Sequence, residues 1–214
     1  EGILREIVAE AGGSENILGL YVEPVQERTG RSFTAESWSA LHALCRELDV
    51  PLLAFETASA CYRSGQGSFA SSAWDEVPDL LAWWGGAHTG YIHTSARFRV
   101  AKPLAMVSTW DGDELSLVRE HHQLRAARTT DLAPAIAALE SALALATEAG
   151  MSVQGCGLYW VIKAGARADE LHAALVAEGV ELRRYPGGHL AVIPCLDTAE
   201  ADAAALKAAL GKVL

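Results

Sequence analysis

The histidines are the first residues to consider for metal binding. His121 and His122 are adjacent in a segment of helical pattern, where neighbouring side chains point about 100° apart, so the two cannot chelate one metal ion together. His88 and His93 flank Gly90, but no carboxylate or cysteine lies at a spacing that would support a metal site. We therefore predict no metal site and expect these histidines to be surface residues or hydrogen-bonded ones.

Two glycine pairs and a tryptophan pair invite a ligand-binding interpretation. Neither Gly85-Gly86 nor Gly187-Gly188 is followed by the helix that a phosphate-binding turn needs, so we predict plain turns at both. Trp83-Trp84 would offer a surface for stacking on a ligand. Because consecutive residues of a strand point to opposite faces, we expect at least one of the two to lie in a core or an interface.

The composition is that of a globular protein and excludes several classes of partner. With 214 residues, 50% of them hydrophobic, the chain can bury a sizeable core, as one large domain or two small ones. A formal net charge of -10 with no Lys/Arg cluster would repel nucleic acid and anionic membrane surfaces, and no segment reaches the length of a membrane span. We expect neither nucleic acid nor a membrane as a partner.

The cysteines and the first residues bear on the compartment. Cys45, Cys61, Cys156 and Cys195 are widely spaced with no CxxC pair, which favours small core residues over disulfides or a thiolate metal site. The start of the sequence has no basic stretch followed by an apolar run. We expect a reducing, cytoplasmic location.

The first part of the chain alternates strand and helix patterns. Apolar runs at residues 17–25, 51–55 and 78–84 predict buried parallel strands. After Thr34, apolar residues recur every three or four positions, which predicts a helix packed on the sheet through Trp38, Leu41, Cys45 and Leu48. The expected fold here is an α/β layer with a mainly parallel sheet.

The second part predicts a smaller α+β unit. An alanine-rich helix from Thr130 ends at Gly150, which suits a left-handed C-cap. It is followed by a strand (156–163), a helix (168–178), a strand pair (180–185 and 189–194) and a last helix, at whose start Asp197 and Glu200 resemble a capping box. We divide the chain into a large-domain half (1–128), a connecting helix (129–150) and a small C-terminal domain (151–214).

Four segments in order resemble the class III aminotransferases, which use pyridoxal phosphate. Residues 23–26 read EPVQ, residues 52–65 resemble the family's LLIxDEVQTGFGRTG, and residues 77–81 resemble its PDIV segment. Residues 108–113 (STWDGD) resemble the STWGGN of the L-lysine 6-aminotransferase branch. The resemblance implies the C-terminal half of the family's large domain followed by its small domain.

The resemblance fails at three residues that carry the family's chemistry. Gly85 stands where a lysine forms the Schiff base to the cofactor, a role that needs a primary amine. Phe55 stands where an aspartate keeps the pyridine nitrogen protonated, and Ile193 stands where an arginine binds the substrate carboxylate. The sequence therefore predicts no catalytic residue and no bound cofactor.

One functional motif of the family is retained. The resemblance implies that Ser108 and Thr109 contact the cofactor phosphate of a neighbouring subunit, a task to which hydroxyl donors are suited. The alternative is that both residues cap a helix starting near Gly112 and that Trp110 packs.

These observations favour an aminotransferase-like pseudoenzyme that acts through protein-protein association, as a homodimer or as a heterodimer with an aminotransferase-like chain. One alternative is a working aminotransferase of lysine or ornithine type, completed by another chain or by an N-terminal region. A third is an unrelated small-molecule enzyme or binding domain on the same framework.

Overall fold

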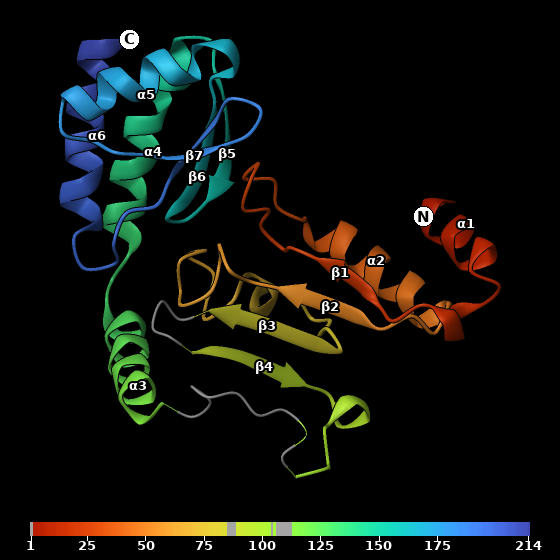
Figure 1. Cartoon of the computed structure of the whole chain (residues 1–214). Coiled ribbons are helices and arrows are strands. Elements are labelled where there is room, and N and C mark those ends of the chain that lie inside the picture. The colour runs from red at the N-terminus through yellow and green to blue at the C-terminus, as the bar shows by residue number, and fades with distance from the viewer. Residues whose placement is uncertain (1, 85–88, 104, 106–112) are drawn as a thin grey trace.

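The computed structural model describes residues 2–84, 89–103, 105 and 113–214. These residues form two four-stranded sheets with helices packed on them (Figure 1). Gly85, His88, Ser108, Thr109 and Trp110 lie outside the described residues, so the predictions made for them stay predictions.

The first sheet has the order β1-β2-β3-β4. Its strands are β1 (Leu20–Val22), β2 (Leu52–Phe55), β3 (Leu80–Trp84) and β4 (Gly90–Thr94). The pairs β1–β2 and β2–β3 are parallel, as predicted, and β4 is antiparallel to β3. Each parallel strand is shorter than its apolar run. The strands β1 and β3 are only partly buried, which corrects the prediction of buried strands there.

One face of this sheet is covered by the predicted helix. Helix α2 (Ala35–Glu47) begins at Thr34, whose hydroxyl accepts from the Ser37 amide in a capping box. Its buried Trp38 and Cys45 pack against Leu52 and Ala54 of β2. The short helix α1 (Gly2–Glu10) adds Leu4 to the margin of the same cluster.

The opposite face of the sheet is apolar and is not fully buried. Side chains alternate along a strand, so the register places the residues that point away from α2 side by side. We call the apolar side chains among them the open face: Tyr21, Leu53, Phe55, Leu80, Ala82, Trp84 and Ile92. Each of them is partly or largely exposed, and Tyr21, Trp84 and Ile92 are exposed by 52%, 49% and 59%.

Two consecutive helices connect the sheets. Helix α3 (Glu114–Thr129) begins at Asp113, whose carboxylate accepts from the Leu115 amide at 3.2 Å. The N-cap residue of α3 is therefore Asp113, and the contacts of Ser108 and Thr109 stay outside the described residues. Helix α4 (Ala133–Glu148) has a proline in its first turn, and the left-handed Gly150 (φ 82°) follows its C-terminal end, as predicted.

The second unit is an antiparallel sheet of order β5-β6-β8-β7 with helices against it. Its elements are β5 (Ser152–Cys156), β6 (Tyr159–Lys163), α5 (Ala168–Ala177), β7 (Arg183–Tyr185), β8 (His189–Val192) and α6 (Ala199–Val213). Sequence analysis missed β5, because Gly155 and Gly157 interrupt the apolar pattern there. Short 3-10 helices among the described residues are η1 (Ser14–Asn16), η2 (Ala70–Ala73), η3 (Ala96–Phe98) and η4 (Gly165–Arg167).

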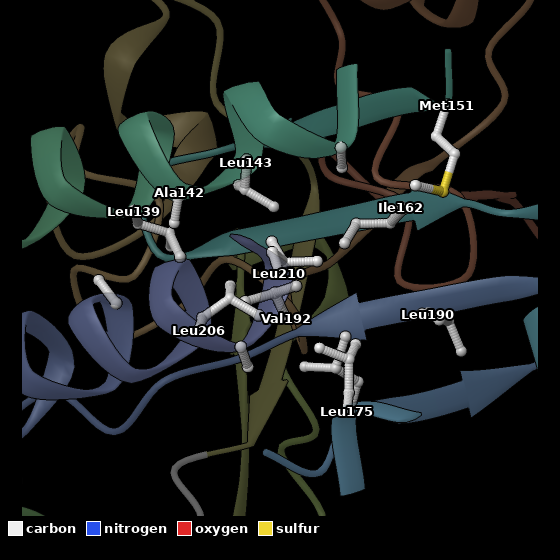
Figure 2. Close-up of a cluster of buried hydrophobic side chains, with 14 of the residues drawn as sticks. Leu139, Ala142, Leu143, Met151, Ile162, Leu175, Leu190, Val192, Leu206 and Leu210 are labelled. Carbon is white, nitrogen blue, oxygen red and sulfur yellow. The ribbon is translucent and has the colours of Figure 1, made fainter. Parts of the chain in front are cut away.

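The main hydrophobic core lies in this second unit (Figure 2). Leucines and alanines of α4 and α6 face each other and the strands β6 and β8, with Leu139, Leu143, Leu206 and Leu210 almost fully buried. Helix α6 does not begin with the predicted capping box, because Thr198 at its N-cap makes no capping bond. The carboxylate of Asp202 instead accepts from the Thr198 hydroxyl at 2.8 Å and from the Cys195 amide at 3.2 Å.

A smaller core joins the two units. Val25, Ala58 and Ala70 of the first unit pack against Tyr159 and Val161 of the second, and Ala191 of β8 completes the cluster. Gly157, in the turn between β5 and β6, has φ 57°, and a Cβ there would lie 2.3 Å from the Arg63 carbonyl oxygen. The backbones of the two units are therefore in direct contact at this turn. Among the described residues, no helix combines the length and hydropathy needed to cross a membrane.

Candidate functional site

A cavity of about 660 Å³ lies between the two units, at the carboxyl ends of the parallel strands. Its lining includes Glu27 after β1, Thr57 and Cys61 after β2, and Trp84 at the end of β3. The second unit and the end of α3 close it with Tyr159, Arg183, Ile193, Cys195, Asp197, Gln123 and Ala127 among others. Open α/β sheets bind ligands at this edge, and the volume suits a small molecule.

Glu27 connects the two units on one side of the cavity. Its carboxylate accepts hydrogen bonds from the hydroxyls of Thr57 (3.2 Å) and Tyr185, and it pairs with Arg183 at 3.2 Å. Its carbonyl oxygen accepts from the Tyr159 hydroxyl at 2.6 Å. Burial raises the pKa of both tyrosines, and the hydrogen bond to Glu27 raises that of Tyr185 further, so both phenols stay neutral donors at pH 7.

Replacing Tyr159 by Phe is expected to lower the free energy of unfolding by about 1–2 kcal/mol, because the partly buried Glu27 carbonyl would lose a hydrogen-bond partner. Urea denaturation monitored by circular dichroism measures the change. Tyr21→Phe is the matched control, since the Tyr21 side chain is 52% exposed, and its effect should stay within about 0.5 kcal/mol. Equal effects of the two changes would contradict this role of Tyr159.

Arg63 connects the two units on another side. Its Nη1 donates to the carbonyl oxygen of Pro194 at 2.8 Å, and its own carbonyl accepts from the Leu158 amide at 2.8 Å. Burial lowers the pKa of the guanidinium, which nevertheless stays charged. Arg63 thus brings a mostly buried positive charge to the wall of the cavity.

The loop that carries Arg63 is held by Glu56, a fully buried residue. The Glu56 carboxyl group accepts four hydrogen bonds, from the Ala70 and Ser71 amides (2.6 and 2.9 Å) and from the Ser59 and Ser71 hydroxyls (2.7 and 2.5 Å). These bonds fasten the start of the loop to the 3-10 helix η2. Glu56 is therefore structural, and its side chain does not line the cavity.

The third wall carries a thiol that is unsuited to nucleophilic attack. Cys61 Sγ lies 3.8 Å from Oε1 of Glu120, a buried residue on α3. Burial and then the Glu120 carboxyl raise the pKa of Cys61 to about 12, and burial raises the pKa of Glu120 itself. At neutral pH the thiol is protonated and acts as a packing group. The four cysteines are free, and only Cys45 is fully buried, so the expectation of small core residues is wrong for the exposed Cys195.

The residues around Phe55 do not fit pyridoxal phosphate. Phe55 ends β2 on the open face, and its ring packs on Tyr21 with centroids 5.2 Å apart, so no carboxylate stands there for a pyridine nitrogen. The Phe55 side chain is partly exposed. Lys163, Lys207 and Lys212 hydrogen-bond Gln154, Ser141 and Glu178 within the second unit, and Lys102, the chain's other lysine, is exposed between η3 and α3.

Three further predictions concern Ile193, the tryptophan pair and His93. Ile193 lines the cavity. The position at which the resemblance implies an arginine therefore does border the cavity, but it carries an aliphatic side chain. Trp83 is buried and stacks on Tyr91, whereas Trp84 is half exposed beside the cavity, as expected for adjacent strand residues. His93 accepts from the Trp83 indole nitrogen at 3.0 Å and is a hydrogen-bonded histidine, as predicted.

Sequence reasoning missed Glu27, Arg63 and Tyr159 as residues of the site. Arg63 does have a signal, because it coincides with the arginine of the family segment GFGRTG, as Glu56 and Gly65 coincide with its glutamate and final glycine. Glu27 and Tyr159 stand 132 residues apart and have no local pattern that would pair them.

Comparisons with known proteins show which family this chain resembles in sequence and which structures it resembles in fold. The family model described as Aminotransferase class-III matches residues 2–214. No curated protein matches the sequence. Similar solved structures include a lysine aminotransferase from M. tuberculosis, with 24% identity and a TM-score of 0.79 over 91% of this chain and 48% of that chain. An ornithine aminotransferase from Toxoplasma gondii ME49 has 22% identity and a TM-score of 0.83 over 99% and 53%.

An (S)-enantioselective omega-transaminase from Thermomicrobium roseum gives 20% identity and a TM-score of 0.83 over 99% of this chain and 53% of that chain. At such identities the structural matches establish the fold alone. The chain spans about half the length of these structures. The resemblance found in the sequence and the predicted fold class are both confirmed.

Proposed function

The chain belongs to the class III aminotransferase family, and we propose that it is a pseudoenzyme of that family, which acts by binding an aminotransferase-like chain and not by catalysis. The observation that carries the proposal is the open face, an apolar sheet surface with Phe55 in the place of the family's cofactor-binding aspartate.

Loss of catalysis follows from missing chemical groups. An electron sink on a pyridine ring needs a carboxylate beside the ring nitrogen, and Phe55 offers none. A covalent link to the cofactor needs an amine, and the sequence has Gly85 at that position. The side chain of Ile193 cannot form the paired hydrogen bonds by which a guanidinium binds a carboxylate. Three separate substitutions thus remove three separate roles.

Association follows from the open face and from the edges of the first sheet. Among the described residues β1 pairs only with β2, and β4 pairs only with β3, so both edges present free backbone donors and acceptors. Apolar faces and open edges of this kind favour pairing with another chain. A partner with the same family fold, identical or different, would provide strands and helices of matching geometry, and the solved relatives are about twice as long as this chain.

A second candidate function is a working aminotransferase completed by another chain or an N-terminal region. It is favoured by the retained Glu56, Arg63 and Gly65 of the family segment and by the cavity, which Arg63 lines. In this case the second chain would have to supply both the amine and the carboxylate that Gly85 and Phe55 lack. In the pseudoenzyme proposal, Ser108 and Thr109 are the residues that would reach the cofactor-phosphate site of the partner chain.

Sedimentation velocity over a concentration series is expected to show association of the purified chain at micromolar concentration, with itself or with an added aminotransferase-like chain. Ile92→Lys, which places a charge on the open face, should weaken the association. Val176→Lys on α5 is the control, because Val176 is similarly exposed but lies in the second unit. A stable interface of this kind buries more than about 1,000 Å². A chain that stays monomeric and binds no such partner would refute the proposal.

A further inference from the structure

The strongest unassigned feature of the cavity is the guanidinium of Arg63. Its one hydrogen bond within the described residues goes to the Pro194 carbonyl, whereas a guanidinium has five N–H donors. No carboxylate of the described residues lies within ion-pair distance of it. Among the described residues, every fully buried side-chain nitrogen has a hydrogen-bond partner. The Arg63 nitrogens that have no partner are therefore accessible to solvent, and Arg63 lines the cavity.

The groups around Arg63 leave its charge uncompensated. The titratable side chains that act on it most are Cys61, Cys195 and Tyr159, and the Cys61 thiol and Tyr159 phenol are neutral at pH 7. The other cation of the lining, Arg183, is already paired with Glu27. Asp197 also lines the cavity but is solvent-exposed. A mostly buried cation is costly without an anion, which a ligand would supply.

The other residues that line the cavity indicate the chemical character of the rest of the ligand. Trp84, Ile193 and Leu196 contribute apolar surface, and the hydroxyls of Tyr159 and Thr57 are occupied by Glu27. A carboxylate can form the paired hydrogen bonds that a guanidinium offers, and an organic acid can in addition cover the apolar part of the lining, which inorganic phosphate cannot. We propose that the cavity binds a small organic monocarboxylate with an apolar body, whose carboxylate is held by Arg63. The site consists of this chain's own residues and requires neither a partner nor a cofactor.

Isothermal titration calorimetry with 4-phenylbutyrate and its neutral analogue 4-phenylbutan-1-ol tests the proposal. The carboxylate is expected to bind at least about tenfold more tightly than the alcohol, because only the carboxylate can pair with a guanidinium. Arg63→Met should remove this preference, and Arg184→Met should keep it, since Arg184 pairs with Asp169 and does not line the cavity. Inorganic phosphate should bind no better than the alcohol does.

Arg63→Met also removes the hydrogen bond to Pro194, so a second pair of variants separates binding from folding. Ile193→Glu places a carboxylate in the cavity beside Arg63 and is expected to block 4-phenylbutyrate and raise the unfolding temperature. Ile193→Gln, of the same size without the charge, should retain the preference for the carboxylate. Equal binding of acid and alcohol, tighter binding of phosphate than of the acid, or identical behaviour of the two Ile193 variants would overturn the proposal.

Discussion

Pyridoxal phosphate added in excess to the purified chain is expected to leave no stoichiometric covalent adduct after borohydride reduction. Gly85 provides no amine where the family carries its lysine, and the Phe55 ring on Tyr21 leaves no carboxylate for the pyridine nitrogen. Lys163, Lys207 and Lys212 are hydrogen-bonded in the second unit, away from the ends of β2 and β3. Visible absorbance and peptide mass spectrometry measure the outcome.

A catalytically active class III aminotransferase treated in parallel provides the positive control. Surface lysines react with aldehydes to a low and scattered extent, so the decisive quantity is occupancy at one site. An adduct near one mole per mole at a single lysine of this chain would refute the pseudoenzyme proposal. The carboxylate proposal for Arg63 would survive that result, because its readout is the difference between an acid and an alcohol.

Replacing Glu56 by Ala is expected to give the largest loss of stability among the single changes considered, about 3 kcal/mol or more, because buried donors are left without an acceptor. The Ala70 and Ser71 amides would both lose their partner inside the protein, whereas the Ser59 and Ser71 hydroxyls can rotate to new ones. The loop with Cys61 and Arg63 would be released from η2. Chemical denaturation measures the loss of free energy.

Glu47→Ala is the matched control for this change. Glu47 makes an exposed ion pair with Arg5 at 2.7 Å, and exposed pairs contribute at most about 1 kcal/mol. Both variants lose one glutamate, so a difference between them reports burial and hydrogen bonding. If Glu56→Ala unfolds at the same denaturant concentration as Glu47→Ala, the loop does not depend on Glu56. Arg63→Met provides a further comparison, since it leaves the Glu56 bonds intact.

The open face and the missing chemistry have a common location. Phe55 occupies the carboxyl end of the central strand β2, where its ring, together with Tyr21, makes the sheet surface continuous and apolar. A charged aspartate at this position would be costly without a cofactor or another cation beside it. Under the pseudoenzyme proposal, the residue that replaces a catalytic group therefore also makes the face more suitable for contact with another chain.

The amino-acid sequence by itself indicated the family and much of the alternation of strands and helices, and it showed that Gly85, Phe55 and Ile193 stand at three positions that carry the family's chemistry. These depend on local patterns: apolar runs predict β1, β2 and β3, the spacing of Trp38 and Cys45 predicts α2, and the motif at residues 52–65 shows Phe55 in the place of an aspartate. Strand ends and caps were less well determined, because glycines interrupt the apolar pattern of β5 and α6 has no side-chain cap where the sequence resembles a capping box.

Only the tertiary structure decided what lines the cavity and which face of the sheet stays open. Arg63 and Pro194 are 131 residues apart, and no periodicity relates positions that meet only when two units pack together. The exposure of Tyr21 and Ile92 likewise depends on which neighbouring elements cover their strands. A strand can show the same apolar pattern whether its face is covered or not, so the pattern does not reveal the exposure. Long-range packing is a property of the whole chain, and local sequence signals carry little of it.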